Sequence, residues 1–207
     1  SGQGRTVLFV SHNMAAVKSL CNRCILLVNG RLEFEGTQTD AVNRYHSLHI
    51  NSNGIEHNGP ISEAPGNNFI RIMRLNALPR KGETLSIFSG IDIVVDFYNS
   101  LIGKDIDVTI EVETFDNIVV FHNGTIVTEN NDSEQGHYFI KFGLPEKFLN
   151  AGKYLLTITF GENQRYVLYH QREIISFEVY PETSGSNSSI LPGIIIPTFN
   201  TEKSFKK

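Results

Sequence analysis

The chain has 207 residues, of which 40% are apolar, and its formal net charge is −4. This length fits one medium domain, or a small domain joined to a fragment. No stretch approaches the roughly 18 consecutive apolar residues of a transmembrane helix. The first residues lack an initiator methionine and the apolar run of a signal peptide, and a predicted strand begins almost at once. We therefore expect a piece of a longer protein.

The charge is distributed unevenly along the chain. Residues 1–50 carry five Lys and Arg against three Asp and Glu, whereas residues 68–180 carry ten against fifteen. Proteins that bind nucleic acids neutralise phosphates with basic surfaces. The acidic balance of the larger region therefore predicts that nucleic acid is not a partner.

Two cysteines, Cys21 and Cys24, are spaced C-x-x-C. A redox motif of this kind needs a thioredoxin-like βαβ context, and a zinc site needs a second ligand pair at suitable spacing. Because neither is visible, we expect two reduced structural cysteines and no metal site. Few cysteines without a disulfide framework favour a cytosolic location.

The first 50 residues are predicted to form a small α/β region. A continuous run of β-formers predicts a buried strand, and Ser or Thr before a periodic apolar stripe predicts a helix start. Asn29-Gly30 marks a hairpin, because both turn positions require a positive φ. The elements in chain order are a strand at 6–10, a helix capped by Ser11 with its stripe at 14–21, a hairpin at 25–36 and a helix at 37–49.

Beyond residue 50 the sequence predicts a linker and then a β-rich domain. Residues 51–67 are dominated by Asn, Gly, Ser and Pro and hold no period. From residue 68 to 180, apolar residues alternate with polar ones, which predicts strands with one buried and one solvated face. Asp116-Asn117 and Asn123-Gly124 are predicted turns between these strands. The pattern indicates an antiparallel sandwich.

Residues 150–154 read Asn-Ala-Gly-Lys-Tyr. They resemble the D-x-G-x-Y corner of immunoglobulin-like sandwiches, in which the tyrosine hydroxyl bonds back to upstream backbone. The asparagine at the first position departs from that pattern. The expected fold is therefore mainly β, an immunoglobulin-like antiparallel β-sandwich behind a small α/β fragment.

The tail, residues 181–207, is predicted to contain a flexible loop and a terminal strand near 190–199. Prolines at both ends of the apolar run restrict it to the edge of a sheet. This strand either completes its own sheet or pairs with a second copy of the chain, since a strand behind a flexible loop is well placed for exchange. The sequence leaves both possibilities open.

His12 lies between the first predicted strand and the first predicted helix. Nucleotide-binding α/β sheets bind ligands at the carboxyl ends of their strands, where a histidine can donate a hydrogen bond to a phosphate oxygen. A strand-Ser-His pattern alone is a weak signal, because a lone histidine at a strand end is an ordinary core or surface residue in most cases.

The segment GRTVLFVSHNMAAVKSLCNRCILLVNGRLEFEGT resembles the last part of ABC-transporter ATPase domains. In that family a strand leads to the H-loop histidine and is followed by a helix and a hairpin with two spaced glycines. His12, Gly30 and Gly36 match these positions. The resemblance implies that residues 1–50 are the end of such a domain, and that His12 contacts the γ-phosphate of ATP and orients the attacking water.

This implied role applies to an intact ATPase that uses ATP and Mg²⁺. No G-x-x-x-x-G-K-[S/T] loop occurs in the chain, and the signature and Walker B motifs are missing too. We do not expect a chain without the phosphate-cradling loop and the Mg²⁺ ligands to hydrolyse ATP, or to hold a cofactor, by itself.

The order of H-loop, hairpin, T-x-x-x-A-V-x-x-Y helix and sandwich resembles the ATP-binding subunits of O-antigen and related polysaccharide exporters (Wzt-like). The resemblance implies that the sandwich recognises an undecaprenyl-linked polysaccharide and couples this recognition to ATP-driven export. It also implies homodimerisation, a membrane-spanning exporter subunit as partner, and a cytoplasmic location at the inner face of the cell membrane.

Sugars are bound by aromatic faces that lie beside polar groups matching their hydroxyls. Each candidate for this role also fits an ordinary cross-strand pair on a solvated sheet. The candidates on predicted wet faces or loops are Tyr98, His122, Tyr138, Tyr166 and Tyr169, with Asp96, Asn99, Glu111 and Glu113 as polar partners.

Two other functions stay open for the sandwich. It can dimerise the ATPase without touching sugar. A glycan-active enzyme is the other alternative, and it requires two carboxylates facing each other across a cleft. Glu111 and Glu113 lie two apart on one strand face and do not by themselves indicate such a cleft.

Overall fold

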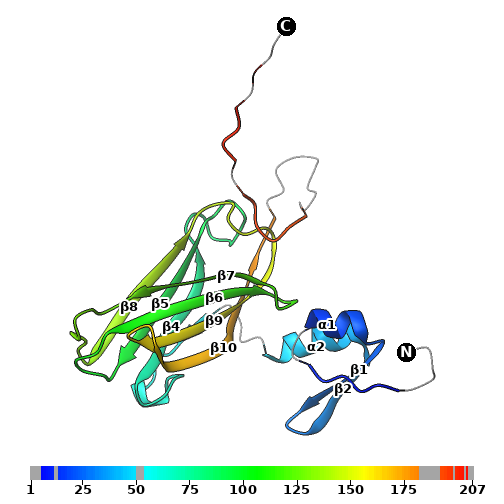
Figure 1. Cartoon of the computed structure of the whole chain (residues 1–207), viewed down its shortest axis with the longest axis horizontal. Coiled ribbons are helices and arrows are strands. Elements are labelled where there is room, and N and C mark those ends of the chain that lie inside the picture. The colour runs from blue at the N-terminus through cyan, green and yellow to red at the C-terminus, as the bar shows by residue number, and fades with distance from the viewer. Residues whose placement is uncertain are drawn as a thin grey trace.

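The computed structural model describes residues 6–11, 14–49, 54–181, 192–197, 199–202 and 204, without the side chains of residues 15 and 46–49. A small α/β unit lies beside one end of a larger β-sandwich (Figure 1). No helix among the described residues is both long and apolar enough to cross a membrane.

The α/β unit contains the predicted helices and hairpin. Asn29 and Gly30 have φ angles of 50° and 76° and form the expected turn. The backbone N–H of Asp40 donates to the Thr37 hydroxyl at 3.2 Å, which caps the second helix. The elements are α1 (Met14–Leu20), β1 (Arg23–Val28), β2 (Arg31–Thr37) and α2 (Gln38–His49).

The buried strand predicted at residues 6–10 is wrong for this structure. These residues form no strand, and Val7, Leu8 and Val10 are 74%, 89% and 96% exposed. A strand needs hydrogen-bonding neighbours, and among the described residues β1 and β2 pair only with each other. Among the described residues, the apolar run at 6–10 therefore has no neighbouring strand to pair with.

The sandwich consists of two antiparallel four-stranded sheets, ordered β10-β9-β6-β7 and β3-β4-β5-β8. This architecture confirms the predicted mainly β fold. The strands are β3 (Gly54–Glu56), β4 (Ile70–Pro79), β5 (Ile91–Asn99), β6 (Ile106–Thr114), β7 (Val119–Ile126), β8 (Gly136–Leu144), β9 (Gly152–Glu162) and β10 (Tyr166–Val179).

The core lies between the two sheets and follows the alternating pattern of the sequence. On β5, Ile91, Ile93, Val95 and Phe97 all point inward and are at most 3% exposed. The ring of Phe97 meets that of Phe160 on the opposite sheet edge-on, with centroids 4.8 Å apart. Burial of this apolar surface is the main force that holds the sheets together, and it leaves the alternate residues on the outer faces.

The structure differs from the predicted linker at residues 51–67. Within this range, residues 51–53 are outside the described part. The residues that follow are ordered into β3, which pairs with β4, and a short 3-10 helix at Ile61–Glu63. Ala64 is 2% exposed. The turn-rich composition therefore belongs to a strand and loops that pack on the sandwich.

One of the two predicted turns is confirmed and the other is wrong. Asn117, with φ 59°, forms the turn between β6 and β7. Asn123 and Gly124 instead lie inside β7, where Gly124 pairs with Thr109. A Cβ on Gly124 would lie 2.5 Å from the Thr109 hydroxyl oxygen. The glycine therefore serves a close approach between strands, as glycines inside strands often do.

The tyrosine corner is confirmed: the Tyr154 hydroxyl donates to the Asn150 carbonyl oxygen at 2.9 Å. The described part of the tail lies against this corner, since the Asn150 N–H donates to the Ile194 carbonyl oxygen at 2.9 Å and Ile195 forms a bridge with Leu149. Residues 192–197 contain no named strand. Exchange of the tail with a second copy stays a prediction.

Candidate functional site

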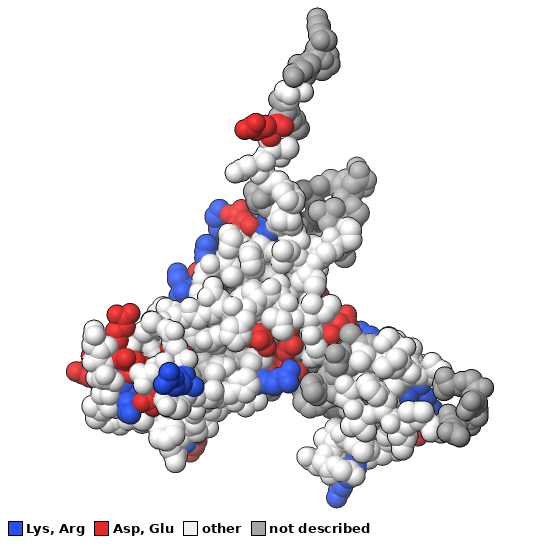
Figure 2. Space-filling model, in the orientation of Figure 1, with Lys and Arg blue, Asp and Glu red and all other residues white. Residues whose placement is uncertain are grey.

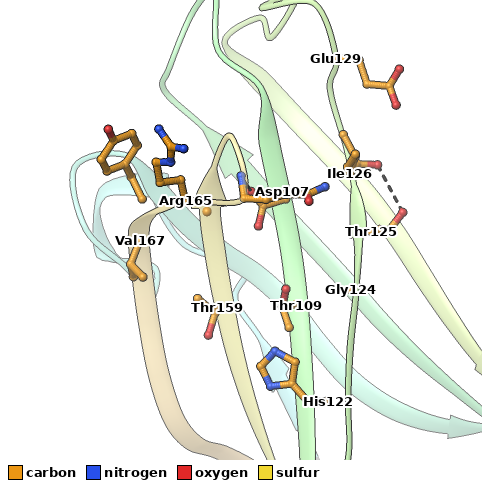
Figure 3. Close-up of a pocket in the computed structure, with 13 residues that line it drawn as sticks. Asp107, Thr109, His122, Gly124, Thr125, Ile126, Glu129, Thr159, Arg165 and Val167 are labelled. Carbon is orange, nitrogen blue, oxygen red and sulfur yellow. Dashed lines mark hydrogen bonds between the residues drawn. The ribbon is translucent and has the colours of Figure 1, made fainter.

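A pocket of about 720 Å³ opens on the outer face of the β10-β9-β6-β7 sheet, at the end where β6 begins and β7 ends (Figure 3). This volume is within the range of small-molecule sites, roughly 300–1,000 Å³. Acidic and basic side chains gather at this end of the sandwich, away from α1 (Figure 2). Its central residues, from three adjacent strands, are Asp107, Thr109, Gly124, Thr159 and Gly161.

Two glycines form the hollow in the sheet surface. Gly161 of β9 pairs with Asp107 of β6 on one side and with Val167 of β10 on the other. A Cβ on Gly161 would lie 2.5 Å from Asp107 Oδ1, just as a Cβ on Gly124 would crowd Thr109. Because these two positions have no side chains, the Asp107 carboxylate lies over Gly161 and the Thr109 hydroxyl lies over Gly124, and these groups form the polar floor.

The polar groups at the floor are held by the sheet and the β9–β10 turn. Asp107 Oδ2 accepts the backbone N–H of Gln164 at 2.8 Å. Thr109 and Thr159 are cross-strand partners on neighbouring strands. The Thr159 hydroxyl lies 2.9 Å from His170 Nδ1. Hydroxyl and carboxylate groups thus present both donors and acceptors to the pocket.

The rim of the pocket is partly apolar. Tyr166 and Val167 on β10 are 59% and 67% exposed, and Ile126 at the end of β7 is 44% exposed. Arg165 and Glu129 add one charge of each sign to the lining. The site therefore combines a polar floor with exposed apolar surface at its edges.

His122 and Tyr166 are the two sequence-predicted residues that line this pocket. His122 Nδ1 lies 3.2 Å from Glu111 Oε2, across the β6–β7 pair. Glu111 does not line the pocket itself but contacts His122, which does. Tyr166 lines the pocket from β10. The structure brings these three residues to one sheet face.

Asp96 and Tyr98 lie on the outer face of the opposite sheet. The Tyr98 ring packs edge-on against His137, with centroids 5.3 Å apart, and His137 Nδ1 is 3.7 Å from Asp96 Oδ1. This cluster belongs to β5 and β8. The two candidate faces are therefore separated by the thickness of the sandwich.

Tyr138, Tyr169 and Asn99 do not lie on wet faces as predicted. Tyr138 stacks on Phe97 at 5.5 Å and its hydroxyl donates to the Glu134 carbonyl oxygen. Tyr169 packs against the core, and burial raises its pKa. Asn99 is fully buried and donates to the Leu101 and Glu134 carbonyl oxygens. Asn99 continues the inward alternation of β5, and Tyr138 is the cross-strand partner of the inward Phe97, whereas Tyr169 follows a register shift in β10.

Glu113 was also predicted on a wet face, but it is 2% exposed. Burial raises the pKa of its carboxyl, and the nearby negative charge of Glu173 raises it further. Periodicity placed Glu113 correctly on the outer face of β6. It did not reveal that this end of the face is covered.

Sequence reasoning missed most of the pocket. Its polar floor, and the residues Thr125, Glu129, Gln164 and Arg165, carry no motif. The available signal was the pair of glycines at positions 124 and 161 inside apolar strands, because such glycines mark a close approach or a gap in the side-chain layer.

His12 lies outside the described residues, so its environment stays a prediction. Cys21 and Cys24 are free thiols. Within the described part of the chain, no cluster of three or more His, Cys, Asp or Glu side chains is placed to hold a metal ion.

Comparisons with known proteins identify the fold of the sandwich. No protein-family model matches the sequence, and neither does a curated protein. The crystal structure of the C-terminal domain of Wzt matches with a TM-score of 0.52 and 18% identity, over 66% of this chain and 86% of that chain. The crystal structure of chicken MD-1 complexed with lipid IVa matches with a TM-score of 0.31 and 11% identity, over 52% of this chain and 94% of that chain. The sandwich thus has the fold of the Wzt C-terminal domain.

Proposed function

We propose that the sandwich is a carbohydrate-recognition domain and that the outer-face pocket holds part of a glycan chain. The observation that carries this proposal is the polar floor at Gly124 and Gly161, where the Thr109 hydroxyl and the Asp107 carboxylate lie over the two glycines, with Tyr166 at the border of the pocket. Sugars present many hydroxyls, which need both donors and acceptors. Their apolar ring faces pack well on exposed aromatic and aliphatic side chains.

The proposed parent protein is the ATP-binding subunit of a polysaccharide exporter. Two observations support it: residues 5–45 resemble the H-loop end of ABC ATPases, and the sandwich has the fold of the Wzt C-terminal domain. In such a parent, His12 would contact the γ-phosphate of ATP, whose hydrolysis also needs Mg²⁺. The sandwich would select an undecaprenyl-linked polysaccharide for a membrane-spanning partner at the cytoplasmic face of the membrane.

Calorimetric titration of the chain with oligosaccharides from the producing organism's own surface polysaccharide tests the glycan proposal. The informative variant is Gly161→Ala, because its Cβ would lie 2.5 Å from Asp107 Oδ1 and would displace the carboxylate from the floor. We expect binding by the unaltered chain and at least a roughly tenfold loss of affinity in the variant, about 1.4 kcal/mol.

Gly143→Ala is the matched control. Gly143 lies in β8 on the opposite sheet, and its Cβ would meet the flexible end of the Arg80 side chain. This variant should bind as the unaltered chain does. Dimerisation without any glycan binding would favour the structural alternative, and hydrolysis of the oligosaccharide would favour the enzymatic one.

The ATPase part of the proposal is tested in the full-length parent. Replacing His12 by Ala should strongly reduce ATP turnover and leave nucleotide binding largely intact, because the histidine acts on the γ-phosphate and the attacking water. Unchanged turnover in that variant would refute the H-loop assignment.

A further inference from the structure

A second, smaller pocket of about 200 Å³ adjoins the outer-face pocket. The two pockets have Asp107, Ile126, Glu129 and Gln164 in common, so they are continuous at the end of the sheet where β6 begins and β7 ends. The smaller pocket adds Asp105 to the lining. We call the two adjoining pockets together the groove.

The groove carries more negative than positive charge. Its carboxylates are Asp105, Asp107 and Glu129, and among the described lining residues Arg165 is the only cationic one. None of these four side chains forms an ion pair with a described residue. Figure 3 shows Arg165 on the β10 side and Glu129 beyond Ile126 on the opposite side, with Asp107 between them. The positive charge therefore lies at one side of the groove and does not neutralise Glu129.

Two charged pairs border the groove and leave this balance unchanged. His122 Nδ1 lies 3.2 Å from Glu111 Oε2, so a proton taken up by His122 is matched by the Glu111 carboxylate. Lys104 Nζ lies 2.8 Å from Glu162 Oε1, and this pair is neutral as well. The negative charges of the groove are therefore not compensated by its neighbours.

The opposite sheet shows the compensated arrangement. Asp92 Oδ1 lies 2.9 Å from Arg80 Nη2, and Asp92 Oδ2 lies 3.3 Å from Lys141 Nζ. A carboxylate between two cations has little charge left for a ligand. The two outer faces of the sandwich thus differ in the charge that they offer to a ligand.

Asp107 lies on the floor of the groove with one oxygen open to a ligand. Its Oδ2 accepts the Gln164 N–H at 2.8 Å, whereas its Oδ1 lies over Gly161 and has no donor among the described residues. The side chain is half-buried, which reduces the screening of its charge by water. An ionised carboxylate only accepts hydrogen bonds. Oδ1 is therefore suited to a hydroxyl or an ammonium group and repels a second anion.

We propose, building on the glycan-binding function proposed above, that the groove selects glycans by charge. It takes sugar residues that are uncharged or carry a protonated amino group, and it rejects residues with a carboxylate, sulfate or phosphate. Asp107 is the principal specificity-determining residue, because an anion beside it meets a like charge instead of an acceptor for its hydroxyls. Asp105 and Glu129 extend the negative potential along the groove, since a concave surface lined by one sign of charge concentrates the field.

An acidic glycan has one alternative, which is to place its anion on Arg165. Arg165 belongs to the turn between β9 and β10 and is exposed, so water and salt screen this contact. Asp105 and Asp107 are half-buried, and their charges are screened less. The exposed guanidinium therefore offsets only part of the repulsion from the three carboxylates.

Titration calorimetry of the whole chain with a matched pair of oligosaccharides tests this selection. Oxidation of the primary hydroxyls of a neutral oligosaccharide from the producing organism's surface polysaccharide gives uronic acids, and reduction of the carboxyl groups of an acidic one gives neutral sugars. Either route yields two ligands with the same linkages and different charge. At low ionic strength we expect the neutral member to bind at least about fivefold more tightly, the factor for two unit charges ~4 Å apart in water.

Two variants and salt separate charge from the other contacts. Glu129→Gln removes one negative charge and keeps the shape of the side chain, so it should narrow the ratio of the two affinities about twofold. Glu178→Gln is the control, because Glu178 lies near the other end of β10, 4.0 Å from Lys153 Nζ, and it should leave the ratio unchanged. Raising the salt to about 1 M shortens the Debye length to about 3 Å and should also narrow the ratio.

The outcomes distinguish the charge selection from the glycan-binding function. Equal or tighter binding of the acidic member overturns the selection and assigns its anion to Arg165, while glycan binding itself stands. An unchanged ratio both in Glu129→Gln and at high salt also overturns the selection, because the preference would then arise from shape. If neither member binds, the glycan-binding function fails, and the selection fails with it.

Discussion

The hydroxyl of Tyr154 donates a 2.9 Å hydrogen bond to the carbonyl oxygen of Asn150, four residues earlier, and it also lies 3.2 Å from the Ile194 carbonyl oxygen. The Asn150 side chain in turn donates from Nδ2 to the Gly193 carbonyl oxygen at 2.7 Å. One corner therefore fixes both the start of β9 and the described part of the tail. An amide at position 150 can donate to that carbonyl, whereas an ionised carboxylate cannot.

Asn150→Asp should destabilise the chain at neutral pH, because the carboxylate oxygen would face the Gly193 carbonyl oxygen. We expect a loss of roughly 1–3 kcal/mol in the free energy of unfolding, the usual penalty of an unsatisfied buried group. The deficit should shrink at pH 3, where aspartate is largely protonated and can donate. Urea denaturation at the two pH values measures it, and an equal deficit at both would contradict this explanation.

Tyr154→Phe removes the corner hydroxyl and leaves two carbonyl oxygens without this donor. The expected loss is roughly 1–2 kcal/mol in the free energy of unfolding, measured by urea denaturation. Tyr166→Phe is the control, since Tyr166 is 59% exposed and should change stability little. Because burial raises the pKa of Tyr154 to about 12, its phenol should also ionise last when tyrosine absorbance is followed at alkaline pH.

Tyr166→Ala tests which of the sequence-predicted aromatic residues serve the pocket. If a glycan binds there, loss of the exposed ring should weaken binding by about 1 kcal/mol, roughly fivefold. Tyr98→Ala removes an equally plausible aromatic residue from the opposite face and should leave affinity unchanged. Titration calorimetry with the same oligosaccharide compares them. A larger loss in Tyr98→Ala would move the site to the β5–β8 face.

Asn117→Gly tests the hold of the β6–β7 turn on α1, because Asn117 Oδ1 accepts the backbone N–H of Met14, the first residue of α1, at 3.0 Å. Glycine accepts the φ of 59° at this position, so the variant removes the side chain without straining the turn. Loss of the Met14 hydrogen bond, about 1 kcal/mol, should make amide exchange in α1 several-fold faster. Asn131→Gly is the matched control, because Asn131 has a φ of 55° and lies in the loop between β7 and β8. Equal exchange in both variants would show that Asn117 does not hold the helix.

Local patterns in the sequence predicted the elements that depend on near neighbours. Asn29-Gly30, the Thr37 cap and the Tyr154 corner each involve residues at most four positions apart, so their geometry follows from the chain itself. The period-2 alternation likewise predicted which side of each strand faces the core. These rules failed where a neighbour was missing or too close, as at residues 6–10 and at Gly124.

Local sequence rules could not predict the pocket, because only the order of the strands in the sheet brings its residues together. Asp107, Gly161 and Val167 lie on three strands, and β6 pairs with both β7 and β9, which a sequence pattern does not specify. The same limit applies to Glu113, whose outward direction was predictable while the covering of its end of the sheet was not. The sequence by itself thus determined the strands, their buried faces and the tight turns, since these follow from local sterics and alternation. Only the tertiary structure decided which polar groups share a surface and which carboxyl is shut away from water, because both depend on contacts between distant segments.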